Sequence, residues 1–250
     1  MSVIIKEMPF EYEGGRIFGL MYLPESFTGK LPAVIMSHGY NSSHEDIGDI
    51  AMGIAEKGFG VYCFDFRGGS NRSKSSGSSL DMTICTEISD LKAVISMVSG
   101  LGYISEEKIF LYGESQGGFV SALTGSELEK GAVAGMVLIY PAFCIPDAHW
   151  TGRPDYPEVQ DFMGMKISRK FAEDKPAYDP FEKLKGFNAP VLIIHGDADP
   201  LVDISYSQRI GGLFPNAELI VYEGEGHGFS APARLKALEK TANFLEKLCR

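Results

Sequence analysis

The sequence predicts an α/β fold built on a mostly parallel sheet with helices on both faces. Short apolar runs such as residues 32–37 and 190–195 alternate along the chain with segments of helical periodicity. This alternation is typical of parallel strands joined by crossover helices. The chain has 250 residues, 44% of them hydrophobic, which is enough for a large core. We therefore expect a single domain over residues 1–250.

The expected elements follow one another regularly. Residues 1–24 are expected to form two antiparallel strands with a turn at Gly14-Gly15. Further strands of an eight-stranded sheet are expected at residues 32–37, 60–66, 108–112, 134–141, 190–195 and 218–222. Helices are expected at residues 45–57, 82–99, 118–123, 205–214 and 231–248.

The alternation breaks over residues 142–188, a proline-containing segment without clear periodicity. A stretch of this length in a compact domain is usually functional, and we interpret it as a small inserted cap. It contains Trp150, Phe162 and Met163, which form either one wall of a binding pocket or the core of the cap itself. Together with Tyr40, these three are our candidate substrate-binding residues.

Charge and targeting signals limit the partners and the location. The formal net charge is -10, which disfavours nucleic acid and anionic membranes as partners. The N-terminus has no signal-peptide pattern, and no apolar run is long enough to span a bilayer. Four cysteines without CxxC spacing indicate reduced thiols, so we expect a cytoplasmic protein. Whether it forms a homodimer is left open.

The pentapeptide that runs from Gly113 to Gly117 places a serine, Ser115, between two glycines. It follows the predicted buried strand at residues 108–112 and precedes a predicted helix. A sharp turn between strand and helix lifts the serine hydroxyl above the sheet, and only glycine fits where the two elements approach. The sequence therefore predicts a nucleophile elbow with Ser115 as the nucleophile.

A serine nucleophile requires a base and an acid that orients that base. His227 lies in a glycine-rich loop between the last predicted strand and the last helix, and it is our candidate base. Two carboxylates, Asp197 and Asp199, follow the strand that ends at His195. Asp197 could instead cap the turn, and Asp199 is followed by a proline that stiffens its loop, so Asp199 is favoured as the acid; part of this preference comes from the family resemblance given below. His195 is interpreted as structural.

Two backbone amides are expected to bind an oxyanion. The amide of Gln116 lies at the start of the helix that follows the nucleophile, where amides have no partner within the helix. The loop at His38-Gly39 follows the first predicted core strand, and it would place the amide of Tyr40 beside that of Gln116.

These motifs carry a resemblance to the α/β-hydrolase superfamily. Within it, the chain is most similar to compact bacterial feruloyl and cinnamoyl esterases and related carboxylesterases. The matching residues extend over nearly the whole chain: His38-Gly39, Asp65-Phe66-Arg67-Gly68, Gly113-x-Ser115-x-Gly117, His195-Gly196-x-x-Asp199 and Gly226-His227. The resemblance implies a catalytic set of Ser115, Asp199 and His227, and a cap between the sixth and seventh core strands.

Other chemistries have little support in the sequence. There is no HExxH motif, and His44 and His149 lack the spacing of metal ligands. There is also no Walker motif, and no G-x-G-x-x-G follows the first core strand. We therefore expect neither a metal nor a cofactor.

Three functions fit these residues. The first is hydrolysis of a small-molecule carboxylic ester, with hydroxycinnamate esters as one substrate class. The second is a peptidase of the same fold, for which Asp147, Asp155 or Glu158 would hold the substrate's α-amine. The third is a binding protein without catalysis, which an intact set of Ser115, Asp199 and His227 disfavours. We expect the first.

Overall fold

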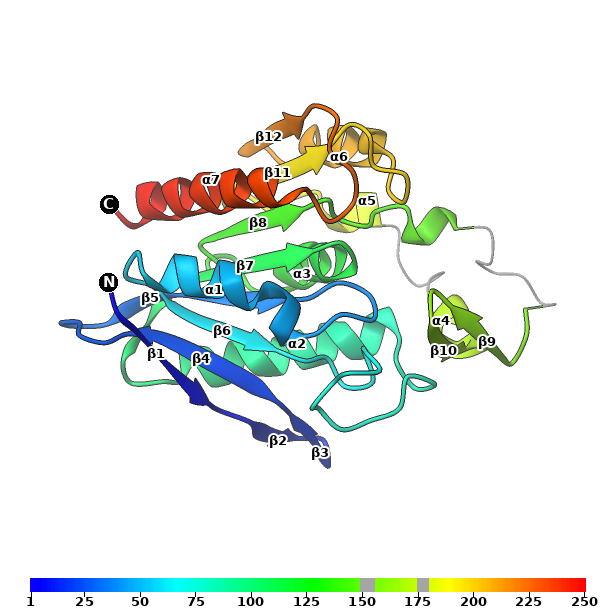
Figure 1. Cartoon of the computed structure of the whole chain (residues 1–250), viewed down its shortest axis with the longest axis horizontal. Coiled ribbons are helices and arrows are strands. Elements are labelled where there is room, and N and C mark those ends of the chain that lie inside the picture. Colours follow the sequence, from blue (N-terminus) through cyan, green and yellow to red (C-terminus); the bar gives the residue numbers. More distant parts are fainter. Residues whose placement is uncertain (149–155, 175–179) are drawn as a thin grey trace.

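An eight-stranded sheet forms the centre of the computed structural model, which describes residues 1–148, 156–174 and 180–250 (Figure 1). In spatial order its strands are β1 (Val3–Glu7), β4 (Gly19–Pro24), β6 (Gly60–Phe64), β5 (Leu31–Ser37), β7 (Ile104–Glu114), β8 (Gly135–Ile139), β11 (Val191–Gly196) and β12 (Ala217–Tyr222). β4 pairs antiparallel with β1 and β6, and the other neighbouring strands are parallel. The predicted fold class is confirmed.

Helices cover both faces of this sheet and divide the core into two clusters. Helices α1 (Gly48–Ala55) and α7 (Ala231–Cys249) pack on one face, in front of the sheet in Figure 1. The other face is covered by α2 (Ile84–Ser99), α3 (Gln116–Glu127) and α6 (Ile204–Gly211). The strand β5 shows the division, since Val34 faces the first cluster and Ile35 the second, and both are fully buried.

The N-terminal region differs from the predicted pair of strands. It forms four strands: β1 and β4 join the main sheet, while β2 (Phe10–Tyr12) and β3 (Gly15–Ile17) pair in a separate ribbon. The chain leaves the ribbon at Phe18, whose amide donates to Ser75 Oγ at 2.8 Å and whose carbonyl accepts from the Asp65 amide at 3.0 Å. The predicted strand over residues 16–23 is therefore interrupted by contacts with a loop distant in sequence.

Two other boundaries differ in ways that affect the site. The predicted helix at residues 45–57 begins with a 3₁₀ turn, η1 (His44–Ile47), and only then continues as α1. The strand β7 starts before the predicted residue 108 and extends to Glu114, so that Ser115 directly joins β7 to α3.

The segment between β8 and β11 lies beyond the ends toward which the parallel strands point (Figure 1). Its described elements are η2 (Ile145–Asp147), β9 (Val159–Phe162), β10 (Met165–Ser168), α4 (Arg169–Glu173) and α5 (Pro180–Lys183). β9 and β10 form a tight hairpin, because Met163 and Gly164 between them both have positive φ, at 48° and 80°.

Among the described residues, this hairpin is held to the loops of the main sheet by five hydrogen bonds, three of which show how it is fixed. The Tyr40 hydroxyl donates to the carbonyl of Phe162 at 2.9 Å, and Asn71 Nδ2 donates to the carbonyl of Gly164 at 2.8 Å. Ser168 Oγ donates to the carbonyl of Leu80 at 2.6 Å. The hairpin is thus fixed over the end of the sheet where the candidate residues lie.

The described ranges contain no membrane-spanning helix, no metal-binding group and no disulfide. No helix there combines the length and apolar character needed to cross a bilayer. No group of three or more His, Cys, Asp or Glu side chains among these residues is arranged to hold a metal ion. The four cysteines all lie in described regions and none forms a disulfide.

Candidate active site

Ser115 occupies a strained turn between β7 and α3. It is the N-cap of α3, with φ 53° and ψ −118°, a conformation that costs a non-glycine residue about 1–3 kcal/mol. The flanking glycines leave no space for a side chain. A Cβ on Gly113 would lie 2.3 Å from the carbonyl oxygen of Gly117, and one on Gly117 would lie 2.4 Å from those of Ser37 and His38. The predicted elbow geometry is therefore present, and packing accounts for both glycines.

Three predicted side chains meet above the C-terminal edge of the sheet. His227 Nε2 lies 2.9 Å from Ser115 Oγ, and His227 Nδ1 lies 2.7 Å from Asp199 Oδ2. The residues follow β7, β11 and β12, whose carboxyl ends share this edge. Since the carboxylate faces Nδ1, that nitrogen carries the proton and Nε2 is free to accept one from the serine.

The side chain of Asp199 is a fully buried carboxylate that accepts four hydrogen bonds. Oδ1 accepts from the amides of Leu201 at 2.8 Å and Val202 at 2.9 Å, while Oδ2 accepts from His227 and from His195 Nε2 at 3.1 Å. Burial opposes ionisation, but the bonds from the two imidazoles and the two amides outweigh it and hold the pKa of Asp199 well below its ordinary value. The carboxylate is therefore charged at neutral pH.

Asp197, the other candidate acid, has a different position. Its Oδ1 accepts from the amide of Gly224 at 2.7 Å, which ties the loop after β11 to the loop after β12. Asp197 is exposed, whereas the side chain of Asp199 is inaccessible to solvent. The structure places Asp199, and not Asp197, against His227.

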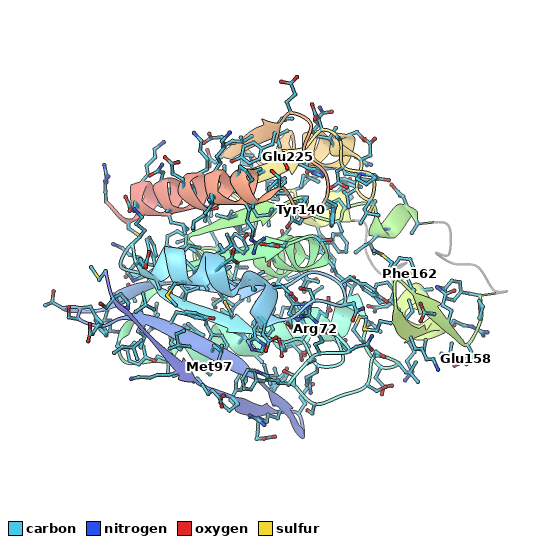
Figure 2. The ribbon with its side chains drawn as sticks, viewed as in Figure 1. Arg72, Met97, Tyr140, Glu158, Phe162 and Glu225 are labelled. Carbon is cyan, nitrogen blue, oxygen red and sulfur yellow. The ribbon has the colours of Figure 1, made fainter. Side chains whose placement is uncertain are left out.

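Behind His227 lies a buried network that the sequence analysis missed. The ring of Tyr140, which follows β8 (Figure 2), lies 4.6 Å from the ring of His227, centroid to centroid. Its hydroxyl donates to Glu114 Oε2 at 2.8 Å, and Tyr112 donates to Oε1 at 2.7 Å. Arg234 of α7 lies 3.2 Å from the same carboxylate. Glu114 occupies a variable position of the elbow motif, so no signal in the sequence indicated this network.

The loop of the predicted oxyanion hole is anchored by a buried histidine. His38 Nδ1 donates to the carbonyl of Gly39 at 2.7 Å, and Nε2 accepts from the amide of Phe66 at 3.1 Å. Burial lowers the pKa of His38, which agrees with this neutral tautomer. No described residue accepts a hydrogen bond from the amide of Tyr40 or of Gln116, and both residues line the cavity above Ser115.

A cavity of about 330 Å³ opens beside Ser115 and is mostly apolar. Tyr40, Phe162 and Met163 line it, so three of the four predicted substrate-binding residues lie at its wall, while Trp150 is outside the described residues. Phe162 lies on β9 (Figure 2). Its ring packs edge-on against the ring of Tyr40, with 5.2 Å between the centroids. The remaining apolar wall of the cavity is formed by Ala142, Ile145, Ala148, Phe171, Leu201 and Val202.

Another buried carboxyl, Glu87 of α2, lies beneath the oxyanion loop. Gln116 Nε2 donates to its Oε2 at 2.9 Å, and Glu87 is almost inaccessible to solvent. Burial raises its pKa to about 8, despite the opposing hydrogen bond from Gln116. Glu87 is therefore mainly protonated at neutral pH, and it supports the side chain of the residue that follows the nucleophile.

Glu87→Gln is expected to make the protein more stable than wild type at alkaline pH. Because the folded-state pKa is above that of the unfolded chain, Glu87 favours folding at low pH. That contribution is lost as the pH rises from about 4.5 to about 8. The free energy of unfolding would be measured with urea at about pH 5 and about pH 9. The value for the variant minus that for wild type should rise between these two pH values by on the order of 2–4 kcal/mol. Glu129→Gln, at an exposed site, should show no such rise. An equal change in both variants would refute the assignment.

The comparison with protein families decides to which family the chain belongs. A model described as serine aminopeptidase, S33, matches residues 30–178, more than half of the sequence. The chain belongs to the serine aminopeptidase S33 family. A second model, described as alpha/beta hydrolase fold, matches residues 148–231. The resemblance to the α/β-hydrolase superfamily expected from the sequence is confirmed.

The individual relatives of this S33-family chain carry names that indicate different activities or none. The uncharacterized protein Rv2307c of Mycobacterium tuberculosis is 25% identical over 224 residues, or 89% of this chain and 72% of the relative. The uncharacterized peptidase YtmA of Bacillus subtilis is 30% identical over 114 residues, or 42% and 40% of the two chains. The ferulic acid complex of Est1E from Butyrivibrio proteoclasticus has a TM-score of 0.87 at 22% identity, over 97% of this chain and 99% of that one. The last likeness is one of fold.

Proposed function

We propose that the chain is a carboxylic-ester hydrolase that works through an acyl-enzyme on Ser115. The observation that carries this proposal is the hydrogen-bonded series from Ser115 Oγ through His227 to Asp199, with distances of 2.9 and 2.7 Å. A serine hydroxyl is a weak nucleophile at neutral pH, and a base within hydrogen-bond reach activates it. Ser115 and His227 line a cavity at the C-terminal edge of the sheet, and the buried carboxylate of Asp199 bonds to His227 at the same edge.

In the first step, Ser115 Oγ attacks the ester carbonyl while His227 Nε2 takes the hydroxyl proton. The imidazolium that forms is stabilised by the charged carboxylate of Asp199 on the opposite side of the ring. The carbonyl oxygen gains negative charge and is held by the amides of Tyr40 and Gln116. A donor of this kind typically contributes about 2.7–4 kcal/mol to lowering the barrier.

In the second step, the bond to the alcohol breaks and His227 returns the proton to the departing oxygen. Water then enters, His227 removes its proton, and the hydroxide attacks the acyl carbonyl. Collapse of this intermediate breaks the bond to Ser115 Oγ, which regains its proton from His227. The products are the free acid and the alcohol, and the protein returns to its starting state.

An uncharged acyl group suits the wall of the cavity. Four polar side chains at this wall already have partners: Tyr40 with Phe162, Gln116 with Glu87, Ser42 with Asp46, and Glu114 with two tyrosines and Arg234. Binding a charged group there would require breaking one of these bonds. We propose esters of small acyl groups, including hydroxycinnamates, as the substrates, and the ferulic acid complex of Est1E supports this choice.

The alternative is a serine peptidase of the same fold, which the family description and YtmA favour. An aminopeptidase would need an acidic group near the cavity to hold the α-amine. Asp147 accepts from the Tyr206 hydroxyl at 2.9 Å and Glu158 is exposed, and neither lines the cavity. Asp155 lies outside the described residues. Glu114 does line the cavity, but its carboxylate is already bound by Tyr112, Tyr140 and Arg234. Of the two functions, the described residues therefore favour the ester hydrolase.

A turnover panel distinguishes the two functions. Purified protein would be assayed with methyl ferulate, short-chain p-nitrophenyl esters and aminoacyl-p-nitroanilides, each also with Ser115→Ala. We expect the esters to be hydrolysed, with kcat/KM for the best ester exceeding that for any anilide by at least about 100-fold. Preference for the anilides would replace this proposal with the peptidase.

Phe162→Ala tests the role of the hairpin in acyl selection. Removing the ring opens the cavity, so kcat/KM for p-nitrophenyl butyrate should fall about 10-fold or more relative to p-nitrophenyl acetate. Val159→Ala is the matched control, because Val159 lies on the same strand, is largely exposed and does not line the cavity. A constant ratio of the two substrates in Phe162→Ala would exclude this wall from acyl binding.

A further inference from the structure

The carboxylate of Asp199 is shared by two imidazoles, not one. His195, the penultimate residue of β11, directs Nε2 at Asp199 Oδ2 from 3.1 Å, and the same oxygen receives His227 Nδ1 at 2.7 Å. His195 Nε2 also lies 3.0 Å from the carbonyl of Val202. The side chains of His195 and Asp199 are both fully shielded from solvent. This contact is therefore a buried part of the site and not a surface ion pair.

The protonation of His195 follows from its surroundings. Nε2 faces two oxygen acceptors, a carboxylate and a backbone carbonyl, so this nitrogen carries the proton. Nδ1 lies 2.6 Å from the hydroxyl of Ser207 on α6, which is also fully buried. In the neutral ring Nδ1 is an acceptor, and the Ser207 hydroxyl donates to it. Ser207 thus fixes the tautomer that lets His195 donate to Asp199.

We propose that His195 is a positioning residue for the reaction, acting through Asp199 on His227. This inference rests on the proposed function. The second donor fixes the rotation of the carboxylate, which aligns Oδ2 with His227 Nδ1. Its hydrogen bond also offsets part of the negative charge on Oδ2. Asp199 therefore stabilises the imidazolium of His227 less strongly than it would without the hydrogen bond from His195. His227 then returns its proton readily to the leaving alcohol.

Several titratable side chains surround this pair and are unchanged in the variants below. Asp203 is the N-cap of α6, with its carboxylate on the Ser205 amide, and its charge interacts with His195. Tyr140 contacts the ring of His227. Glu114 lies behind Tyr140 and pairs with Arg234. Two more belong to adjoining loops: Glu225 bonds to Ser230, and Cys144 Sγ lies 3.9 Å from the carbonyl of Leu201. The variants therefore leave these other titratable groups around the pair in place.

The test is the pH profile of kcat/KM for p-nitrophenyl acetate in two variants of His195. His195→Leu removes the donor, while His195→Gln offers an amide N–H at a similar distance from the backbone. We expect His195→Leu to lower kcat/KM by about 10–100-fold. Its acidic limb should move to higher pH by about half a unit or more, because the charge of Asp199 is then concentrated on His227. His195→Gln should restore most of both. An unmoved acidic limb in His195→Leu would overturn the proposal.

Two further measurements keep the outcomes separate. If the leucine variant does not fold, as judged by circular dichroism, Ser207→Ala decides. It removes only the hydroxyl that fixes the tautomer and should shift the limb in the same direction by less, and an unchanged profile overturns the inference. Wild type without Ser115-dependent turnover would refute the proposed function itself. If wild type turns over the ester and the variants have the same kcat/KM and pH profile as wild type, only the role of His195 is refuted.

Discussion

Ser115→Ala is expected to lower kcat for p-nitrophenyl acetate by roughly 10⁴–10⁶-fold. The variant keeps the oxyanion amides and the cavity but has no nucleophile within reach of His227 Nε2, which lies 2.9 Å from Ser115 Oγ. Stability should not fall, because alanine retains the Cβ and the Ser115 hydroxyl makes no other hydrogen bond with the residues that the structure describes. Stopped-flow or spectrophotometric turnover, together with thermal unfolding, measures both quantities.

Ser121→Ala is the matched control for this loss. Ser121 lies on the same helix, α3, is fully buried, and its hydroxyl has no hydrogen-bond partner among the described residues. Its removal should leave kcat within about 2-fold of wild type, since it changes neither charge nor a hydrogen bond. If Ser115→Ala kept more than about 1% of the wild-type kcat, another residue would have to supply the nucleophile.

Gly117→Ala should have the largest effect on folding. The added Cβ would lie 2.4 Å from two backbone carbonyl oxygens, those of Ser37 and His38, and backbone cannot move aside as a flexible side chain can. Either β5 separates from α3 or the turn at Ser115 opens. We expect a loss of more than about 4 kcal/mol in the free energy of unfolding, or no soluble protein. Urea unfolding followed by tryptophan fluorescence and circular dichroism measures this loss.

Gly102→Ala provides the comparison for the same chemical change. A Cβ at Gly102 would meet no atom within 4 Å, and its φ is outside the range that favours glycine. This variant should unfold within about 1 kcal/mol of wild type. A Gly117→Ala protein of similar stability would contradict the close approach of β5 and α3 in the structure.

The geometric features that the sequence predicts and the structure shows are those encoded by short-range patterns. The glycines on both sides of Ser115 follow from a local steric requirement, and the sheet follows from apolar runs separated by helical periods. Convergence of Ser115, Asp199 and His227 follows from topology, because the residues after parallel strands meet at one edge. None of these inferences required knowing which side chains touch.

What the sequence did not reveal depends on contacts between distant residues. Phe18 interrupts a predicted strand because its amide bonds to Ser75. Arg234 joins Glu114 although 120 residues separate them. In each case the partner is chosen by packing of whole elements, for which a single sequence carries no signal.

The segment between β8 and β11 shows a related limit. The strands β9 and β10 have four residues each, too few to give a recognisable alternation, so residues 142–188 appeared aperiodic. The pattern nevertheless contained a clue in Met163-Gly164, since a glycine in a two-residue turn is typical of a hairpin. The aromatic side chain of Phe162 reaches the cavity because this hairpin is hydrogen-bonded to loops of the main sheet, through Tyr40 among others.

The most direct measurement of the central claim is reaction with a fluorophosphonate, followed by mass spectrometry of the intact protein and of its peptides. Activation of one serine by His227 predicts a single adduct per chain, located on the peptide that contains Ser115. The adduct should be absent from Ser115→Ala and strongly slowed in His227→Ala. Labelling at a different serine, or an unmodified wild-type protein under conditions that label a known serine esterase, would contradict the account.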